Sequence, residues 1–500
     1  MALTNGPLLN SVPAPIQQAL QTNYLDLSSA ANAGWGQQYL PDLMEKEAEV
    51  FGKRTISGFL SKIGAEEAMT ADQVIWSEQG RLHLSYKCQT ASTTTITIQS
   101  DIDGNNEDTT NGISGAGDDP INHGVRVNDT IIISDANQLV KALVTVVNGD
   151  VITVAPYGAT TITHTNVALG TTILVYGSEY GKGTRYDAAD GTFNNSDSRG
   201  ANEPSFRTFT NKPIILKDYY EVSGSDASRI GWVEIAAEEG QSGYLWYLKA
   251  EADTRARFND YLEMAMLEGE RSALAGASTD ADAQLGMTGS QVGTEGLFAA
   301  IESRGNLTSG ISGTSAALDL AEFDAILAEF DRQGAIEENM LFVNRATALA
   351  FDDMLASMNS YGEGGTSFGV FENDENMALN LGFSGFRRGS YDFYKSDFRY
   401  LNDLATRGGI NAASAANAIR GVIVPAGTST VYDQTLGKNL KRPFLHVRYR
   451  ASKTDNRKMK TWTTGSVGAS TSALDAMQIH MLSERCLITQ GANNFMLIKG

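Results

Sequence analysis

The main basic stretch in this 500-residue chain lies between Lys438 and Lys460. It holds nine basic residues against a single acid, Asp455. The alternation from Phe444 to Arg450 predicts a strand, because successive side chains of a strand point to opposite faces. One face would carry Leu445, Val447 and Tyr449, and the other Phe444, His446, Arg448 and Arg450. We expect a hairpin turn over Lys453–Arg457.

A basic strand of this kind can bind either nucleic acid or an acidic protein surface. Single-stranded nucleic acid sites place several aromatic side chains among the basic ones, whereas lysine and arginine dominate this stretch and Phe444 and Tyr449 are its two Phe, Tyr or Trp residues. We therefore expect the strand to pair with the acidic surface of a neighbouring copy of the chain, with nucleic acid as the alternative. The candidate inter-subunit contact residues are Trp35, Lys441, Arg442, Arg448, Arg450, Lys453, Arg457 and Lys458.

No stretch combines the residue types and spacing of a catalytic, nucleotide or metal site. Gly177–Thr184 is one residue short of a phosphate loop, and Gly183 stands where Ser or Thr would bind magnesium. Asp101–Gly112 begins like a calcium loop but lacks the required glycine and the bidentate glutamate. Gly362–Gly369 lacks a flanking strand–helix–strand unit, and the five histidines are scattered without metal-ligand spacing. The sequence therefore predicts no enzyme, no cofactor and no bound metal.

The overall composition limits the possible partners. The chain has 39 basic and 59 acidic residues, a net charge of −20, which argues against wholesale binding to nucleic acid. Its two cysteines, Cys88 and Cys486, provide no disulfide framework and suit a reducing compartment. The first basic residue is Lys46, so we expect no secretory signal, and no apolar run is long enough to span a membrane.

The strongest helical pattern runs from Ser242, a candidate N-cap, to Ala275, with Gly276 after it. We interpret it as a spine helix, and Asp226–Glu238 as a shorter helix before it. Two i,i+4 ion pairs are expected, Glu251–Arg255 and Asp253–Arg257. The predicted apolar stripe is Leu245, Leu248, Ala252, Ala256, Asn259, Leu262, Met266 and Ala273.

The region before this helix predicts an arm and a long β hairpin. Three early prolines make residues 1–40 a broken, partly apolar arm, and Pro41 begins a short helix. Gln73–Gln89 and Ile214–Val222 are predicted strands that could pair as one hairpin. Between them, residues 91–176 are rich in Thr, Val and Ile and predict an inserted small all-β domain. Asn148-Gly149, between two valine-rich runs, predicts a type I′ turn.

After the spine helix, alternating strands and helices predict an α/β domain over residues 294–435. Its helices are expected at Leu297–Ile301, Leu318–Phe330 and Ala346–Met358, and its strands at Leu341–Val343, Tyr391–Leu401 and Arg420–Pro425. Gly408–Ala418 is expected to be a flexible loop. The chain then returns through the basic strand to strands within Met477–Lys499.

This order resembles the major capsid proteins of tailed bacteriophages, which have the Hong Kong 97 fold. The resemblance covers about residues 1–90 and 177–500 and rests on the order of elements, and Met481–Gly500 is similar to capsid proteins of crAss-like gut phages. It implies an α+β fold with these parts: N-terminal arm 1–40; start of the peripheral domain and outgoing extended-loop strand 41–90; inserted all-β domain 91–176; returning extended loop 177–222; spine helix and peripheral domain 223–293; axial domain 294–435; and peripheral return strands 436–500.

The resemblance also implies a function. A capsid protein of this class is a structural component of the virion that self-assembles into hexamers and pentamers, forming an icosahedral head around double-stranded DNA. Implied partners are further copies of the chain, portal, auxiliary or head-fibre proteins, and DNA held weakly and non-specifically on the inner face. Assembly would take place in the host bacterial cytoplasm, without a membrane. The alternatives are an encapsulin-like compartment shell, a multidomain hydrolase with an accessory β module, and a cell-surface or fibre protein.

Overall fold

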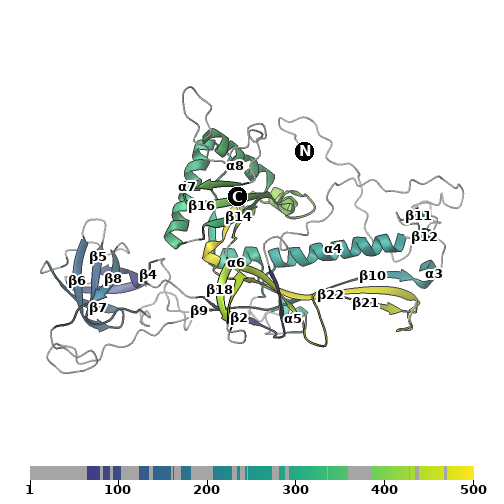
Figure 1. The fold of residues 1–500 in the computed structure, drawn as a ribbon, viewed down its shortest axis with the longest axis horizontal. Coiled ribbons are helices and arrows are strands. Elements are labelled where there is room, and N and C mark those ends of the chain that lie inside the picture. The colour runs from purple at the N-terminus through teal and green to yellow at the C-terminus, as the bar shows by residue number, and fades with distance from the viewer. Residues whose placement is uncertain are drawn as a thin grey trace. The chain divides into compact units, whose positions relative to one another are not determined.

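The computed structural model of the chain is a mixed α and β structure with many strands (Figure 1). It describes residues 65–78, 83–90, 94–102, 123–134, 139–158, 162, 171–181, 207–227, 234–236, 242–244, 246–272, 281–287, 292–334, 336–358, 385–426, 428–433, 438–466 and 470–500. The predicted arm, the helix after Pro41, Gly362–Gly369 and most of Asp101–Gly112 lie outside these residues. The chain divides into two compact units: Met1–Trp76 with Phe209–Gly500, and Ser77–Thr208.

In the first unit, the spine helix is α4, which spans Trp246–Glu268 and is shorter than predicted. It ends before Gly269, not at Gly276. A Cβ added at Gly269 would lie 2.5 Å from the Ala265 carbonyl oxygen and 2.6 Å from that of Thr294, so only glycine fits where the chain leaves the helix.

The predicted start of the spine helix is also wrong. Ser242 is not an N-cap, because β12 (Ser242–Tyr244) forms an antiparallel pair with β11 (Glu234–Ala236). The helix expected over Asp226–Glu238 is limited to α3 (Gly224–Ala227), and β11 follows it. Pairing between the two short strands therefore replaces the helical turns that the sequence pattern favoured.

The buried face of α4 is displaced from the predicted stripe. Leu262 and Met266 are buried as expected, whereas Ala252 is exposed. Thr254 and Phe258 continue the buried line toward the N-terminal end at i,i+4 spacing. The Glu251–Arg255 ion pair is confirmed at 3.0 Å. The guanidinium of Arg257 lies 3.2 Å from Asp218, on the sheet beneath the helix.

This sheet has the order β1-β20-β22-β10, and a fifth strand, β21, pairs with the other end of β22. Its central strand, β22, is antiparallel to three neighbours, and α4 runs along β10 and β22 (Figure 1). Phe258, Leu262 and Met481 form the buried cluster between helix and sheet. The strands are β1 (Ala65–Met69), β10 (Ile214–Ser223), β20 (Leu445–Arg450), β21 (Lys460–Gly465) and β22 (Ala476–Thr489).

The predicted pairing of Gln73–Gln89 with Ile214–Val222 is wrong. The whole of β10 pairs with β22, and the first predicted strand is divided in two. Its first part, β2 (Val74–Glu78), pairs with β9 (Arg207–Asn211), and its second part begins the barrel described below. β10 and β22 pair over ten residues. This longer and more buried pairing is favoured over one with Gln73–Gln89.

The second sheet of the first unit has six strands, in the order β13-β23-β17-β14-β16-β15. The strands predicted for the α/β domain lie in this sheet. The C-terminal strand β23 also belongs to it and pairs with β13 and β17. This differs from the expectation, which places that strand among the peripheral return strands 436–500. The strands are β13 (Asn306–Thr308), β14 (Glu338–Val343), β15 (Gly385–Arg388), β16 (Tyr391–Asp397), β17 (Ile419–Pro425) and β23 (Met496–Lys499).

The three helices predicted for this domain are confirmed: α6 (Leu297–Arg304), α7 (Ala316–Gln333) and α8 (Arg345–Met358). Ser315 accepts a hydrogen bond from the Leu318 amide and caps α7, which ends at Gly334 with a φ of 65°. The predicted loop Gly408–Ala418 is wrong, because α10 (Arg407–Ala413) and a 3-10 turn (Ala415–Asn417) occupy it.

The remaining elements of the first unit are short: α5 (Ala281–Gln284), α9 (Arg399–Asn402), the hairpin β18 (Thr428–Asp433) with β19 (Lys438–Pro443), and a 3-10 turn at Ala492–Asn494. Among the described helices, we find none with the length and apolar character that crossing a membrane requires.

The second unit contains a closed barrel in the order β3-β4-β7-β6-β5-β8. It begins at Ser85, earlier than the predicted residue 91. Isoleucine and valine fill its interior, because every second side chain of each strand points inward. The strands are β3 (Ser85–Thr90), β4 (Thr95–Asp101), β5 (Asp129–Ser134), β6 (Leu139–Asn148), β7 (Val151–Pro156) and β8 (Thr171–Ser178).

The predicted hairpin at Asn148-Gly149 is present, but its turn is shifted by one residue. Asn148 pairs with Val151, so the two central residues are Gly149 and Asp150. Gly149 has a φ of 56°, and Asp150 has no positive φ. A type I′ turn needs positive φ at both positions, so this turn is not of that type.

Candidate functional site

The basic strand, β20, lies inside its sheet, parallel to β1 and antiparallel to β22. Leu445 and Val447, predicted to share one face of the strand, are both buried. His446, on the face expected to be polar, is also buried, with 2% of its surface exposed. It pairs in register with Ile488, which belongs to a buried cluster with Val74 and Trp76. The start of the polar face is therefore covered by the chain itself.

The next basic residues form ion pairs with acids of the neighbouring strand. The parallel register of β1 and β20 places Glu67 opposite Arg448, and the guanidinium lies 2.9 Å from the carboxylate. Glu66, one residue earlier, pairs with Lys458. These two acids lie in a strand that the sequence analysis did not predict. They neutralise part of the positive charge within the same chain.

The centre of the basic cluster is Glu484 on β22, whose side chain is only 5% exposed. Its two carboxylate oxygens lie 2.8 Å from Nε of Arg450 and 2.7 Å from Nη1 of Arg457. Arg450 also donates a hydrogen bond to Asp72, and this bond raises the pKa of the guanidinium. One buried acid thus connects β20 to the chain beyond the turn.

The remaining candidates are distributed differently. Trp35 lies outside the described residues, and Lys441 and Arg442 lie on β19. The predicted turn is present, since the Ser452 amide donates to the Asp455 carbonyl oxygen and Ala451 bridges Asn456. Lys453 is exposed there and, within the described part of the chain, makes no ion pair. Among the predicted contact residues whose side chains the structure describes, it is the one best placed for an outside partner.

A row of exposed aromatic side chains, which the sequence analysis missed, crosses the face of the sheet opposite α4. Tyr219 on β10, His480 on β22 and Trp462 on β21 are direct cross-strand neighbours. The His480 ring stacks on Trp462 at 5.1 Å and on Tyr219 at 5.9 Å between centroids. Tyr219 is 55% exposed and Trp462 is 37% exposed. The available sequence signal was the period-two spacing within each strand. That signal does not reveal the row, because the row forms only when β10, β22 and β21 pair in register.

Of the rejected glycine-rich motifs, the structure describes the first part of Gly177–Thr184. Gly177 lies inside β8, so it does not begin a loop that leads into a helix, as a phosphate loop requires. Over the described residues, no three His, Cys, Asp or Glu side chains are grouped as metal ligands would be. Cys88 and Cys486 are both buried, and burial raises the pKa of each thiol to about 12.

Comparison with known proteins gives structural neighbours only. No family model and no curated protein matches the chain. A chain from Gordonia phage Cozz is 10% identical, with 97% of this chain and 99% of that chain covered and a TM-score of 0.37. A chain from Microbacterium phage Oxtober96 is 9% identical, with 94% and 99% covered and a TM-score of 0.36. The capsid of an empty GTA particle is 12% identical, with 95% and 99% covered and a TM-score of 0.34.

Proposed function

We propose that this chain is the major capsid protein of a tailed bacteriophage and self-assembles into hexamers and pentamers of an icosahedral head around double-stranded DNA. The observation that supports it is the order of elements in the first unit. The ribbon β2–β9 precedes α4, α4 lies on a sheet, a helix-covered six-stranded sheet follows, and the chain returns through β20 and β22. This is the order that the resemblance to the Hong Kong 97 fold implies.

Within this proposal, each part has a role. We assign β2–β9 to the extended loop, α4 with the β22 sheet to the peripheral domain, and the six-stranded sheet to the axial domain. The barrel would be a domain inserted in the extended loop. Residues 1–40 would be the arm that reaches a neighbouring subunit. The C-terminal strand β23 joins the sheet that we assign to the axial domain.

The exposed surface of the first unit supports self-association. The Tyr219–His480–Trp462 row is a ladder of aromatic groups on an open sheet face, and aromatic residues are enriched where protein surfaces meet. The net charge of −20 also supports a capsid role, because it would keep contact with packaged DNA weak. Portal, auxiliary and head-fibre proteins would be the other partners in the virion.

Electron microscopy of the purified full-length chain tests this proposal. We expect hexamers, pentamers or closed shells in negative stain, and large species in sedimentation velocity, because a capsid protein buries its interfaces only in the assembly. The measurement is repeated over a range of salt concentrations, with and without the other head proteins of a phage. A chain that stays monomeric under every condition would contradict the proposal.

Lys453 provides a sharper test of the basic stretch. We expect Lys453→Glu to lower particle yield without changing the melting temperature, because this exposed side chain supports no ion pair among the described residues. Lys453→Gln, which removes the charge without reversing it, should have an intermediate effect. Arg448 and Arg450 are less suitable, since reversing either would place an acid beside Glu67 or Glu484. Unchanged yield from Lys453→Glu would remove this residue from the interface.

A further inference from the structure

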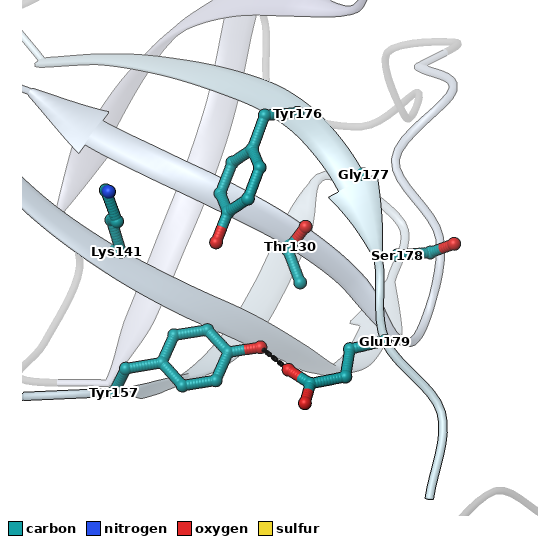
Figure 2. Close-up of a pocket in the computed structure, with 7 residues that line it drawn as sticks. All are labelled: Thr130, Lys141, Tyr157, Tyr176, Gly177, Ser178 and Glu179. Carbon is teal, nitrogen blue, oxygen red and sulfur yellow. Dashed lines mark hydrogen bonds between the residues drawn. The ribbon is translucent and has the colours of Figure 1, made fainter.

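The barrel has an open hollow of about 510 Å³ on its outer wall. Figure 2 shows the rings of Tyr157 and Tyr176 facing this space, with Thr130 and Lys141 beside them and Glu179 at one end. Tyr157 is 52% exposed and Tyr176 is 51% exposed, so both rings offer an accessible face. The hollow lies entirely within the second unit, so its geometry depends only on the barrel.

Hydrogen bonds of the barrel fix the positions of Tyr157 and Glu179. The Tyr157 amide donates to the Lys141 carbonyl oxygen at 3.0 Å, and the Glu179 amide donates to that of Asn128 at 3.0 Å. The Tyr157 hydroxyl donates a hydrogen bond to the Glu179 carboxylate (Figure 2). Groups fixed in this way lose little conformational entropy when a ligand binds.

The composition of the hollow suits an amphipathic ligand. Two phenol rings provide flat apolar surface, while the carboxylate accepts hydrogen bonds and the lysine ammonium donates them. A pyranose ring has the matching chemistry, because its C–H groups form an apolar face and hydroxyls surround its edge. An extended apolar ligand would leave both charged groups without new partners.

The net charge of the barrel segment distinguishes between charged and uncharged amphipathic ligands. Residues 91–180 contain ten acids and two basic residues, a net charge of −8. A segment with this net charge disfavours nucleotides, nucleic acid and sulfated sugars. Among the described residues that line the hollow, Lys141 is the one base and Glu179 the one acid, and Figure 2 shows them on opposite sides of the space. The ligand is therefore expected to be uncharged.

We propose that this hollow binds a neutral saccharide, with the Tyr157 and Tyr176 rings against its C–H faces and Glu179 and Lys141 hydrogen-bonded to its hydroxyls. The site is a binding site without catalysis. It is independent of the capsid proposal, because it requires only the barrel. On an assembled particle, many weak copies of the site would act together.

Saturation-transfer NMR on the full-length chain tests this inference. The probes are the methyl glycosides of glucose, galactose and N-acetylglucosamine and their β-linked trisaccharides. We expect at least one to bind with a millimolar Kd. Tyr157→Ala and Tyr176→Ala should each weaken that binding about tenfold, because each removes one stacking ring. Tyr157→Phe, which keeps the ring, should retain most of the affinity, and Glu179→Gln should weaken it.

The matched control is Tyr394→Ala. Tyr394 is also 52% exposed but lies on β16, in the other unit, so its removal should leave saccharide binding unchanged. Far-ultraviolet circular dichroism and a thermal melt establish that each variant is folded, and Glu179→Gln keeps the test informative if a tyrosine variant unfolds. The inference is overturned if no neutral probe binds, if only sulfated or phosphorylated sugars bind, or if the folded tyrosine variants bind like the unchanged chain.

Discussion

Replacing Phe323 with alanine should lower the free energy of unfolding of the first unit by about 3–5 kcal/mol. Phe323 on α7 is fully buried, and its ring contacts three others: Phe351 at 5.7 Å, Phe386 at 5.7 Å and Phe393 at 5.2 Å between centroids. Two of these partners lie on β15 and β16 and one on α8. The cavity would therefore loosen both helices from the sheet at once.

Tryptophan fluorescence during urea unfolding measures this loss in the relevant unit. The five tryptophans are Trp35, Trp76, Trp232, Trp246 and Trp462, so none lies in the second unit. Tyr394→Ala is the control, because this exposed side chain of β16 should contribute little. A Phe323→Ala midpoint within experimental error of the control would mean that α7 is not packed on the sheet through this aromatic cluster.

Local periodicity explains why this domain was predicted well. The apolar positions Phe323, Ile326, Leu327 and Phe330 repeat at helical spacing, and all four are buried on one face of α7. Ser315 and Gly334 mark its two ends through capping, which depends only on neighbouring residues. Helical periodicity and capping can be read from the residues of a single helix and its two ends, without knowledge of distant parts of the chain.

Strand pairing could not be predicted in the same way, because it depends on distant parts of the chain. Both Gln73–Gln89 and Ile214–Val222 have strand patterns, but nothing in either identifies β22 as the partner of β10. The same limit affects α4. Thr254 and Glu263 are buried although they are polar. Their burial depends on the elements that pack against α4, so the spacing of hydrophobic residues does not predict it.

The basic stretch shows the same division between local and long-range information. Its alternation placed Leu445 and Val447 on one face of the strand, and both are buried. Its acidic partners come from far away in the sequence, and a neighbouring copy was expected to supply them. Glu66 and Glu67 approach through β1, and Glu484 through β22. The available signal for an internal partner was Glu484 itself, a single acid in the largely apolar sequence of β22.

Replacing Glu484 with glutamine should destabilise the first unit by about 3 kcal/mol, the low end for breaking a buried ion pair. The carboxylate is 5% exposed and accepts both Arg450 and Arg457, so its neutral replacement leaves two guanidinium groups without their shared counter-charge. Those groups are 25% and 30% exposed, and partial hydration limits the loss. Because the pair joins β20 to the chain after the turn, the same change should loosen the turn that carries Lys453.

Urea unfolding followed by tryptophan fluorescence again measures the effect, with Glu329→Gln as the matched control. Glu329 pairs with Arg332 at 2.8 Å, but the two side chains are 38% and 70% exposed, so losing that pair should cost less than about 1 kcal/mol. Equal effects of the two substitutions would show that Glu484 is hydrated in solution. The basic stretch would then keep its positive charge available, and contact with a neighbouring subunit through Arg450 and Arg457 would again be the better interpretation.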